Sequence, residues 1–436
     1  MRGHENKDVS SHAGDGPHRQ GAVMTTHEMD TWKTAESGDE HELTTDVQWF
    51  TGSPQTHRVA RAITQYGPIA RTTLAQLLGL SQGALSRITS DLIYEGVIEE
   101  LPGDTTEQGR LPQGFIPKES REKRGRPQTN LRLRAGERTF LGINIHGSEV
   151  SIVAVDALCR PVGPCRTVTL ESTKPQDVAA TIGTAIRKYR SDVTPSPVAV
   201  GMSFGGHAED DRYVTYAPFL HWDGRVDAAG AIEQTSGLPT AVFNDLDSLL
   251  LYESWFGAGI GVRRFAVVTI GAGVGYSLAE DGMPVDYPDK SYGLAGHILV
   301  DPEGPRCYAG HTGCSQCLTN DSLAEEYSGM VGHMVTFDQF AADAQEGTAQ
   351  ARQLLNRLCF RLGVLVSTVA NFAMPSKVLI SGESSFLAKM NQESIRSGIN
   401  WYRPSQAATV DFEILDFSWE SWAKAAAARA IARYIG

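Results

Sequence analysis

The stretch that decides the N-terminal fold is VARAITQYGPIARTTLAQLLGLSQGALSRITSDLIYEGVIEE, residues 59–100. Its apolar residues recur with helical spacing in three short runs, and the third run places Leu85, Ile88 and Leu92 on one face. A tight turn, Gly79-Leu80-Ser81, precedes the third run and ends in a residue suited to capping a helix. Strand-like residues follow from Val97. Three helices followed by strands predict a winged helix-turn-helix.

The third predicted helix turns four polar residues away from its apolar face, where they can meet a DNA groove. They are Gln82, Ser86, Arg87 and Ser90. Gln and Arg side chains can each form two hydrogen bonds with a base edge, to adenine and guanine respectively. Three further residues are candidates for backbone or minor-groove contacts, namely Arg71, Arg124 and Arg126. The alternative is a three-helix protein-interaction domain with solvated arginines.

Charge is distributed unevenly along the 436 residues, although the overall composition is that of an ordinary soluble protein. The chain has a net charge of −12, but residues 55–134 carry 12 Lys/Arg against 8 Asp/Glu, a local charge of +4. A basic segment favours contact with a polyanion, although chance gives the same value. Because no stretch approaches about 20 apolar residues and the N-terminus is polar, we expect a cytoplasmic, nucleoid-associated protein without a membrane partner.

Three domains are predicted from shifts in composition along the chain. Residues 1–50 lack an apolar period and are expected to be disordered. Residues 51–134 form the winged helix-turn-helix with an extended wing and linker. From 135 to 436, near-continuous apolar strands such as PVAVGMSF (197–204) and FAVVTIGAG (265–273) alternate with helices, as in a buried α/β sheet.

The two parts together resemble the ROK family (repressors, open reading frames, kinases), from about residue 55 to the C-terminus. The match in the first part covers the helical run and Gly125-Arg126-Pro127. For the second part, the resemblance implies a two-lobed actin-like ATPase fold, which is ribonuclease H-like. It also implies operator double-stranded DNA as partner, a sugar or sugar-phosphate effector, and a homodimer or dimer of dimers.

Two loops carry the phosphate-binding signal, and the first departs from the family. The family's D-x-G-G-T loop reads Asn144-Ile145-His146-Gly147-Ser148 here, so the leading Asp is lost and a bulky ring replaces a glycine. The second loop carries Gly271, Gly273 and Gly275 after a buried strand, and its small residues leave backbone N–H groups open to phosphate. A plain strand turn has the same pattern. The broken first loop predicts that the protein is not an enzyme.

The sugar-binding segment is also only partly retained. Asn244 and Asp245 match the family's Asn-Asp pair, whose Asp is the general base in kinases; as an alternative, Asp245 caps a helix. In the family, two further carboxylates help to bind the sugar. At these two positions this chain has Leu294 and Gln316 instead. The effector is therefore changed, weakly bound or absent.

A cysteine cluster indicates a structural zinc site. The resemblance implies His297, Cys307 and Cys314 as ligands, but the family's middle Cys is Ala309 here. Zinc takes four ligands in a closed site. If a helix starts at Cys314, Cys317 lies on the same face three residues later and is a candidate for the fourth ligand, and His311 is the other candidate. The alternative is a degenerate site with free buried thiols. His297 also faces the sugar in the family.

These observations predict a DNA-binding transcriptional regulator, a repressor of carbohydrate-related genes, with a non-catalytic sensing domain. Two other functions stay open. One is a ROK sugar kinase with an appended DNA-binding domain, and the other is a repressor that needs no ligand.

Overall fold

The computed structural model describes residues 48–101, 109–118, 129–222, 224–286 and 293–436. Most of the predicted N-terminal tail, together with Arg124 and Arg126, lies outside the described residues. The predicted disorder does not extend to Trp49 and Phe50, which are buried. The backbone N–H of Trp49 donates to the carbonyl of Tyr434, 2.9 Å away. Because Asp46–Gly436 forms one unit, the boundary at residue 134 stays a prediction.

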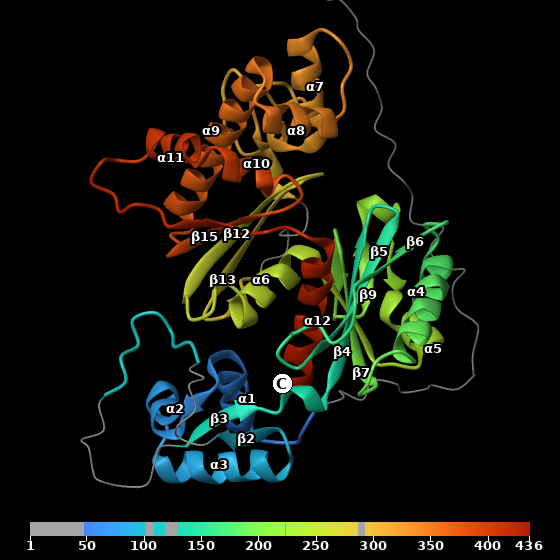
Figure 1. The fold of residues 1–436 in the computed structure, drawn as a ribbon, viewed down its shortest axis with the longest axis vertical. Coiled ribbons are helices and arrows are strands. Elements are labelled where there is room, and N and C mark those ends of the chain that lie inside the picture. The colour runs from blue at the N-terminus through green and yellow to red at the C-terminus, as the bar shows by residue number, and fades with distance from the viewer. Residues whose placement is uncertain (1–47, 102–108, 119–128, 223, 287–292) are drawn as a thin grey trace, which may run out of the picture. The chain divides into compact units, whose positions relative to one another are not determined.

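Three helices and a small antiparallel sheet form the N-terminal part of the described chain (Figure 1). The sheet has the strand order β1-β3-β2. The core of this N-terminal part contains apolar residues of all three helices, including Ile63, Leu74 and Leu85. The elements are α1 (Pro54–Tyr66), β1 (Ile69–Ala70), α2 (Arg71–Leu78), α3 (Gln82–Tyr94), β2 (Ile98–Leu101) and β3 (Asn130–Leu133). This is the order of elements expected for a winged helix-turn-helix.

A five-stranded sheet follows, with the strand order β11-β7-β4-β5-β6. Strand β4 runs parallel to β7, and β7 runs parallel to β11, so the carboxyl ends of these three strands lie at one edge. Nearly all residues of β4 and β7 are buried, as the continuous apolar runs predict. The strands are β4 (Thr139–His146), β5 (Glu149–Asp156), β6 (Arg166–Thr169), β7 (Pro197–Phe204) and β11 (Thr240–Asn244).

Helices cover this sheet. α4 (Pro175–Arg190) packs against α5 (Ala228–Ser236), while the C-terminal helix α12 (Trp419–Ile435) contacts β4, β5 and β7 (Figure 1). A separate antiparallel sheet has the order β10-β9-β8, with the strands β8 (His207–Glu209), β9 (Tyr213–Tyr216) and β10 (Val226–Asp227). Glycines in the strands allow α12 to approach closely. A Cβ at Gly142 would lie 1.9 Å from the carbonyl oxygen of Ala423.

A second five-stranded sheet has the order β14-β13-β12-β15-β16. Its strands are β12 (Arg264–Ile270), β13 (Val274–Glu280), β14 (Met283–Pro284), β15 (Lys377–Ser381) and β16 (Phe412–Ile414). The helices of this half are α6 (Asp245–Phe256), α7 (Asn320–Val331), α8 (Phe337–Glu346), α9 (Ala349–Phe372), α10 (Ser385–Met390) and α11 (Gln392–Trp401). α6 also contacts α12 (Figure 1). Two sheets joined in this way follow the two-lobed architecture that the sequence predicts.

Candidate functional site

Helix α3 presents the polar face that the sequence predicts for contact with DNA. Leu85, Ile88 and Leu92 are buried on one side. The four predicted residues on the other side are all exposed, namely Gln82, Ser86, Arg87 and Ser90. The helix begins at a side-chain cap, because the Oγ of Ser81 accepts a hydrogen bond from the N–H of Ala84 at 3.2 Å. The exposed side chains therefore lie on a helix whose N-terminus is capped.

Helix α2 is joined to the start of α3 by a tight turn. Its first residue, Arg71, already forms an ion pair within the fold. Gly79 ends α2 with a φ of 68°, a left-handed conformation that suits glycine. Arg71 forms an ion pair with Glu100, with an N–O distance of 2.8 Å. A phosphate at Arg71 would thus compete with a carboxylate.

A cleft of about 690 Å³ lies where the two five-stranded sheets face each other. Asn244 and Asp245 reach it from the end of β11 and the start of α6. The three glycines of the second loop, Gly271, Gly273 and Gly275, reach it from the β12–β13 hairpin. His297 reaches it from a 3-10 turn, η4 (Leu294–His297). The cleft thus brings together all six residues predicted to bind ligand.

Asp245 lines the cleft and does not cap α6. The cap is Asn244, whose Oδ1 accepts from the N–H of Asp247 at 3.0 Å. The Oδ1 of Asp245 accepts from its neighbour Leu246, and its Oδ2 lies 3.5 Å from the position of a Cβ on Gly205. Burial raises the pKa of Asp245 to about 6, and the charge of Asp247 adds to the increase. The carboxylate is therefore poorly solvated and open to a partner.

The first loop is closed by its own side chains. Asn144 is buried, and its Nδ2 donates to the Oγ of Ser203 at 3.0 Å. The ring of His146 stacks on Trp419 with centroids 3.7 Å apart and planes within 1°, while its Nε2 lies 3.0 Å from the Oγ of Ser151. Burial lowers the pKa of His146, which favours the neutral ring. The loop therefore offers an aromatic surface instead of a cradle for phosphate.

The second loop keeps its small residues but faces a carboxylate. A Cβ at Gly275 would lie 2.4 Å from the Oγ1 of Thr269, so the loop tolerates little bulk there. A Cβ at Gly271 would lie 3.2 Å from the Oε2 of Glu383, which accepts a hydrogen bond from the Nδ2 of Asn320 at 3.0 Å. Leu294 and Gln316, which replace family carboxylates, also line the cleft.

Sequence reasoning missed one wall of the cleft, an aromatic cluster near the C-terminus. Phe417, Trp419 and Trp422 line the cleft together with His146. Phe417 and Trp419 meet edge to face with centroids 4.8 Å apart, and Trp419 lies 6.2 Å from Trp422. The density of aromatics in FSWESW, residues 417–422, was the available signal.

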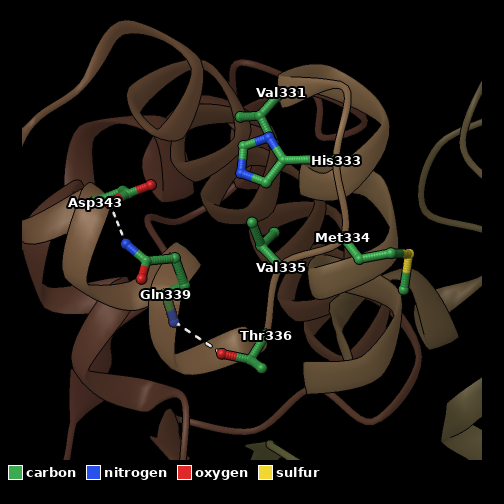
Figure 2. Close-up of a pocket in the computed structure, with 7 residues that line it drawn as sticks. All are labelled: Val331, His333, Met334, Val335, Thr336, Gln339 and Asp343. Carbon is green, nitrogen blue, oxygen red and sulfur yellow. Dashed lines mark hydrogen bonds between the residues drawn. The ribbon is translucent and has the colours of Figure 1, made fainter.

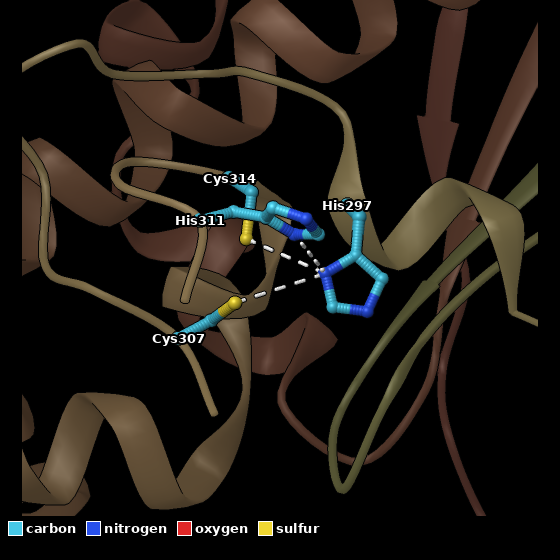
Figure 3. Close-up of side chains that lie close together, drawn as sticks. All are labelled: His297, Cys307, His311 and Cys314. Atoms are coloured by element: carbon cyan, nitrogen blue, oxygen red, sulfur yellow. Dashed lines mark hydrogen bonds between the residues drawn. The ribbon is translucent and has the colours of Figure 1, made fainter. Parts of the chain in front are cut away.

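Beside the cleft, four side chains form what we call the His/Cys group, His297, Cys307, His311 and Cys314 (Figure 3). Their ligand atoms all lie within 4.8 Å of one another. The Nδ1 of His297 is 3.8 Å from the Sγ of Cys307, 3.7 Å from the Sγ of Cys314 and 3.1 Å from the Nδ1 of His311. The edges of a tetrahedral zinc site with two N and two S ligands are roughly 3.3–3.8 Å. The group therefore has the donors and the size for such an ion.

Cys317, the first choice for a fourth ligand, lies outside this group. It sits in a 3-10 turn, η5 (Ser315–Leu318), and belongs to the hydrophobic core beside Leu318 and Leu323. Burial raises the pKa of its thiol to about 12. His311, the other candidate, is brought to Cys307 by a short hairpin in which the N–H of Cys307 donates to the carbonyl of His311 at 2.9 Å.

A second hollow, of about 500 Å³, lies between α7 and α8 (Figure 2). Three of its polar side chains, Thr336, Gln339 and Asp343, form hydrogen bonds within the fold. Asp343 accepts from the Nε2 of Gln339 at 2.8 Å and from the hydroxyl of Tyr327 at 2.6 Å. His333 and Met334 complete the rim. The predicted site residues do not line this hollow, so we place the candidate function in the cleft and on α3. Within the described part of the chain, no helix is long and apolar enough to cross a membrane.

Comparison with known proteins agrees with this architecture. The NagC protein of Escherichia coli K12, a DNA-binding transcriptional dual regulator, is 26% identical over 355 residues, which cover 78% of this chain and 83% of NagC. A glucokinase of Halalkalibacterium halodurans is 26% identical over 277 residues, 56% of this chain and 80% of that enzyme. The chain is thus similar in sequence to relatives of both kinds, regulators and kinases.

A solved structure extends the likeness to most of the chain. It is described as a ROK family transcriptional regulator, homolog of the E. coli MLC protein. It superposes with a TM-score of 0.68 at 22% identity, covering 87% of this chain and 96% of that chain. The likeness concerns the fold, and it confirms the predicted fold class. The ROK family profile matches residues 140–433, about two thirds of the sequence. The chain therefore belongs to the ROK family.

Proposed function

We propose that this protein is a DNA-binding transcriptional regulator, a repressor of carbohydrate-related genes, whose cleft senses a sugar without catalysis. One observation carries the proposal: α3 holds Gln82, Ser86, Arg87 and Ser90 exposed on one short helix, in a part of the chain that lies before the family domain. An exposed row of such donors is what base edges in a major groove require. Arg124 and Arg126 add phosphate or minor-groove contacts, and Arg71 can add another if its ion pair with Glu100 opens.

Sequencing of genomic fragments retained by the purified full chain tests the DNA half. We expect enrichment of a palindromic sequence, because a homodimer or dimer of dimers presents α3 twice about a two-fold axis. Half-site centres should lie about 10–10.5 base pairs apart, or a multiple of that spacing. Fragments enriched without a common sequence would contradict the proposal.

Kinase activity is the second candidate function, since Asp245 and the Gly271–Gly275 loop are in place. The closed first loop argues against it, because His146 and Trp419 stack where the loop would otherwise open. We therefore propose that the protein is not an enzyme. Consumption of ATP in the presence of glucose, N-acetylglucosamine or xylose, lost in Asp245→Asn, would establish the kinase instead.

The His/Cys group would hold a structural zinc ion through His297, Cys307, His311 and Cys314. With four protein ligands and no open position, the ion would stabilise the loop rather than activate water. His297 belongs both to this group and to the wall of the cleft. The metal would thus fix the position of a residue that faces the sugar.

Helix α12 offers a physical connection between the cleft and the DNA-binding part. Trp419 and Trp422 at its start line the cleft. At its end, the carbonyl of Ile435 lies 2.6 Å from the Nδ1 of His57 on α1. A sugar that shifts the start of α12 would therefore act on α1, which packs against α3. If the cleft no longer binds a sugar, as in the alternative of a ligand-independent repressor, no sugar will change operator affinity.

A further inference from the structure

Two groups of side chains that line the cleft come from different parts of the fold, and we call them the hydroxyl end and the aromatic end. The hydroxyl end contains Asp245 and His297, and the aromatic end contains His146, Phe417, Trp419 and Trp422. From these surroundings we infer that the effector is a neutral glycoside of at least two sugar units, with one unit at Asp245 and the next on the face of the aromatic end. This inference rests on the proposed sensing function.

The negative charge of the cleft favours a neutral ligand over a phosphorylated one. Three carboxylates line it, Asp245, Asp247 and Glu383, whereas none of its described lining residues is Lys or Arg. Glu383 stands against the second glycine loop, where a phosphate would otherwise approach the backbone N–H groups. Carboxylates accept hydrogen bonds from sugar hydroxyls but repel phosphate oxygens. A sugar phosphate or a nucleotide, which is negatively charged, would therefore enter a cleft that is itself negatively charged.

Strand register gives the separation of the two backbones that carry His146 and Asp245. Ile145 of β4 and Asn244 of β11 both lie opposite Phe204 of β7, on its two sides. Neighbouring strands are about 4.8 Å apart, so the two backbones are roughly 10 Å apart at this level. His146 and Asp245 are the next residues along the chain. With bonds of about 1.5 Å, a six-membered ring with its hydroxyls is roughly 5–6 Å wide, which leaves room for a second ring.

The aromatic end has the chemistry that a second sugar ring would need. A pyranose presents one face of C–H groups, and the electron-rich face of an aromatic ring attracts such groups. The stack of His146 on Trp419 is fixed from the side by Phe417 and Trp422, so the surface needs little ordering when a ligand binds. The volume of about 690 Å³ lies within the range of roughly 300–1,000 Å³ seen for sites that bury larger ligands.

Calorimetry on the full chain with matched sugars tests the inference. The probes are glucose, N-acetylglucosamine and xylose, the disaccharides cellobiose, chitobiose and xylobiose, the 6-phosphates of the first two, and ATP. We expect at least one disaccharide to bind ten times more tightly than the monosaccharide from which it is built. It should also bind ten times more tightly than the 6-phosphate of that monosaccharide, where one is among the probes. A monosaccharide, a sugar phosphate or ATP as the tightest ligand would overturn the inference but leave the regulator in place. Absence of binding by every sugar would overturn the sensing function as well.

Substitution of Trp419 locates the second unit. Trp419→Ala should weaken the preferred disaccharide at least tenfold and its monosaccharide less than threefold, and Trp419→Phe should restore part of the loss. Trp401→Ala is the matched control, because Trp401 is 69% exposed on α11 and does not line the cleft. Melting curves for each variant show whether it is folded. Equal losses for both sugars in a folded Trp419→Ala protein would contradict a second unit at this position.

Discussion

The polar face of α3 and the cleft are built in opposite ways. The face on α3 comes from one helix of 13 residues, Gln82–Tyr94, whose other side is buried in a core of its neighbours. The cleft is assembled from segments between Ile145 and Trp422, and several of its groups also bond within the fold. A surface that depends on one helix can change its ligand without changing the fold. In the cleft, recognition and stability are coupled.

This difference has a consequence for which substitutions separate function from folding. Arg87 is exposed, so its substitution tests the proposed DNA contact while the buried face of α3 is unchanged. Asp245 is half-buried with a raised pKa, so its loss affects both the ligand and the folded state. His297 belongs to the cleft and to the His/Cys group together.

The largest effect is expected at the His/Cys group. Cys314→Ser should reduce zinc from about one ion per chain to nearly none, because a structural site that loses a thiolate binds the ion far more weakly. His311→Ala should do the same. The measurement is metal analysis of protein purified without added zinc, together with melting curves before and after a chelator, which should lower the melting temperature of the wild type but not that of Cys314→Ser or His311→Ala.

Cys317→Ala is the matched control, since Cys317 is a buried thiol in the core beside the group. It should keep its zinc, with at most a modest decrease in melting temperature. Loss of zinc in Cys317→Ala, with zinc retained in His311→Ala, would assign the fourth ligand to Cys317 and contradict the group described here.

The next effect concerns the hydroxyl end of the cleft. Asp245→Asn keeps the shape of the side chain but removes the charge that strengthens hydrogen bonds from sugar hydroxyls. Such bonds to a charged group contribute about 1.5–3 kcal/mol, so the affinity for the best sugar should decrease roughly 10–100-fold. Calorimetry measures the affinity, and operator binding without sugar should stay at the wild-type level. A variant that binds the sugar normally would remove Asp245 from the site.

The sequence predicted α3 and the glycine hairpin because the forces that shape them act between close neighbours in the chain. The apolar spacing of Leu85, Ile88 and Leu92 fixes which side of the helix is exposed. The aromatic end of the cleft could not be found in this way. His146 meets Trp419 because β4 and α12 pack together in the tertiary fold, and no local pattern encodes that pairing.

The choice between Cys317 and His311 shows the same limit within one loop. Helical spacing after Cys314 suggested that Cys317 would share its face. The residues form a 3-10 turn instead, and burial beside Leu318 and Leu323 draws the thiol into the core. The hairpin that returns His311 to Cys307 depends on backbone hydrogen bonds that the ligand spacing does not reveal.

A smaller effect is expected on α3. Arg87→Ala should weaken binding to the preferred operator by about 1–3 kcal/mol and relax the preference at one base pair, if Arg87 contacts a base edge. Stability should stay within about 0.5 kcal/mol, because the side chain is exposed. Gel-shift titrations against the operator and against single-base variants measure both quantities. Arg352→Ala, at another exposed arginine, is the control and should bind operator normally. An unchanged operator preference in Arg87→Ala would remove this residue from base recognition.

The smallest effect separates stability from ligand binding at Asp245. Its pKa rises from 3.8 to about 6 on folding, mainly through burial. Well below pH 3.8 the carboxyl is protonated in both the folded and the unfolded chain, whereas above pH 6 the folded chain carries a poorly solvated charge. The stability contributed by this group is therefore present at low pH and lost as the pH rises through 6. Asp245→Asn, which cannot ionise, should match the wild type near pH 4 and exceed its stability near pH 7.5, although it binds sugar less well. Urea unfolding of both proteins at the two pH values measures the difference, in which the other titrating groups cancel. A difference that is the same at both pH values, or largest at pH 4, would show that burial does not penalise this carboxylate.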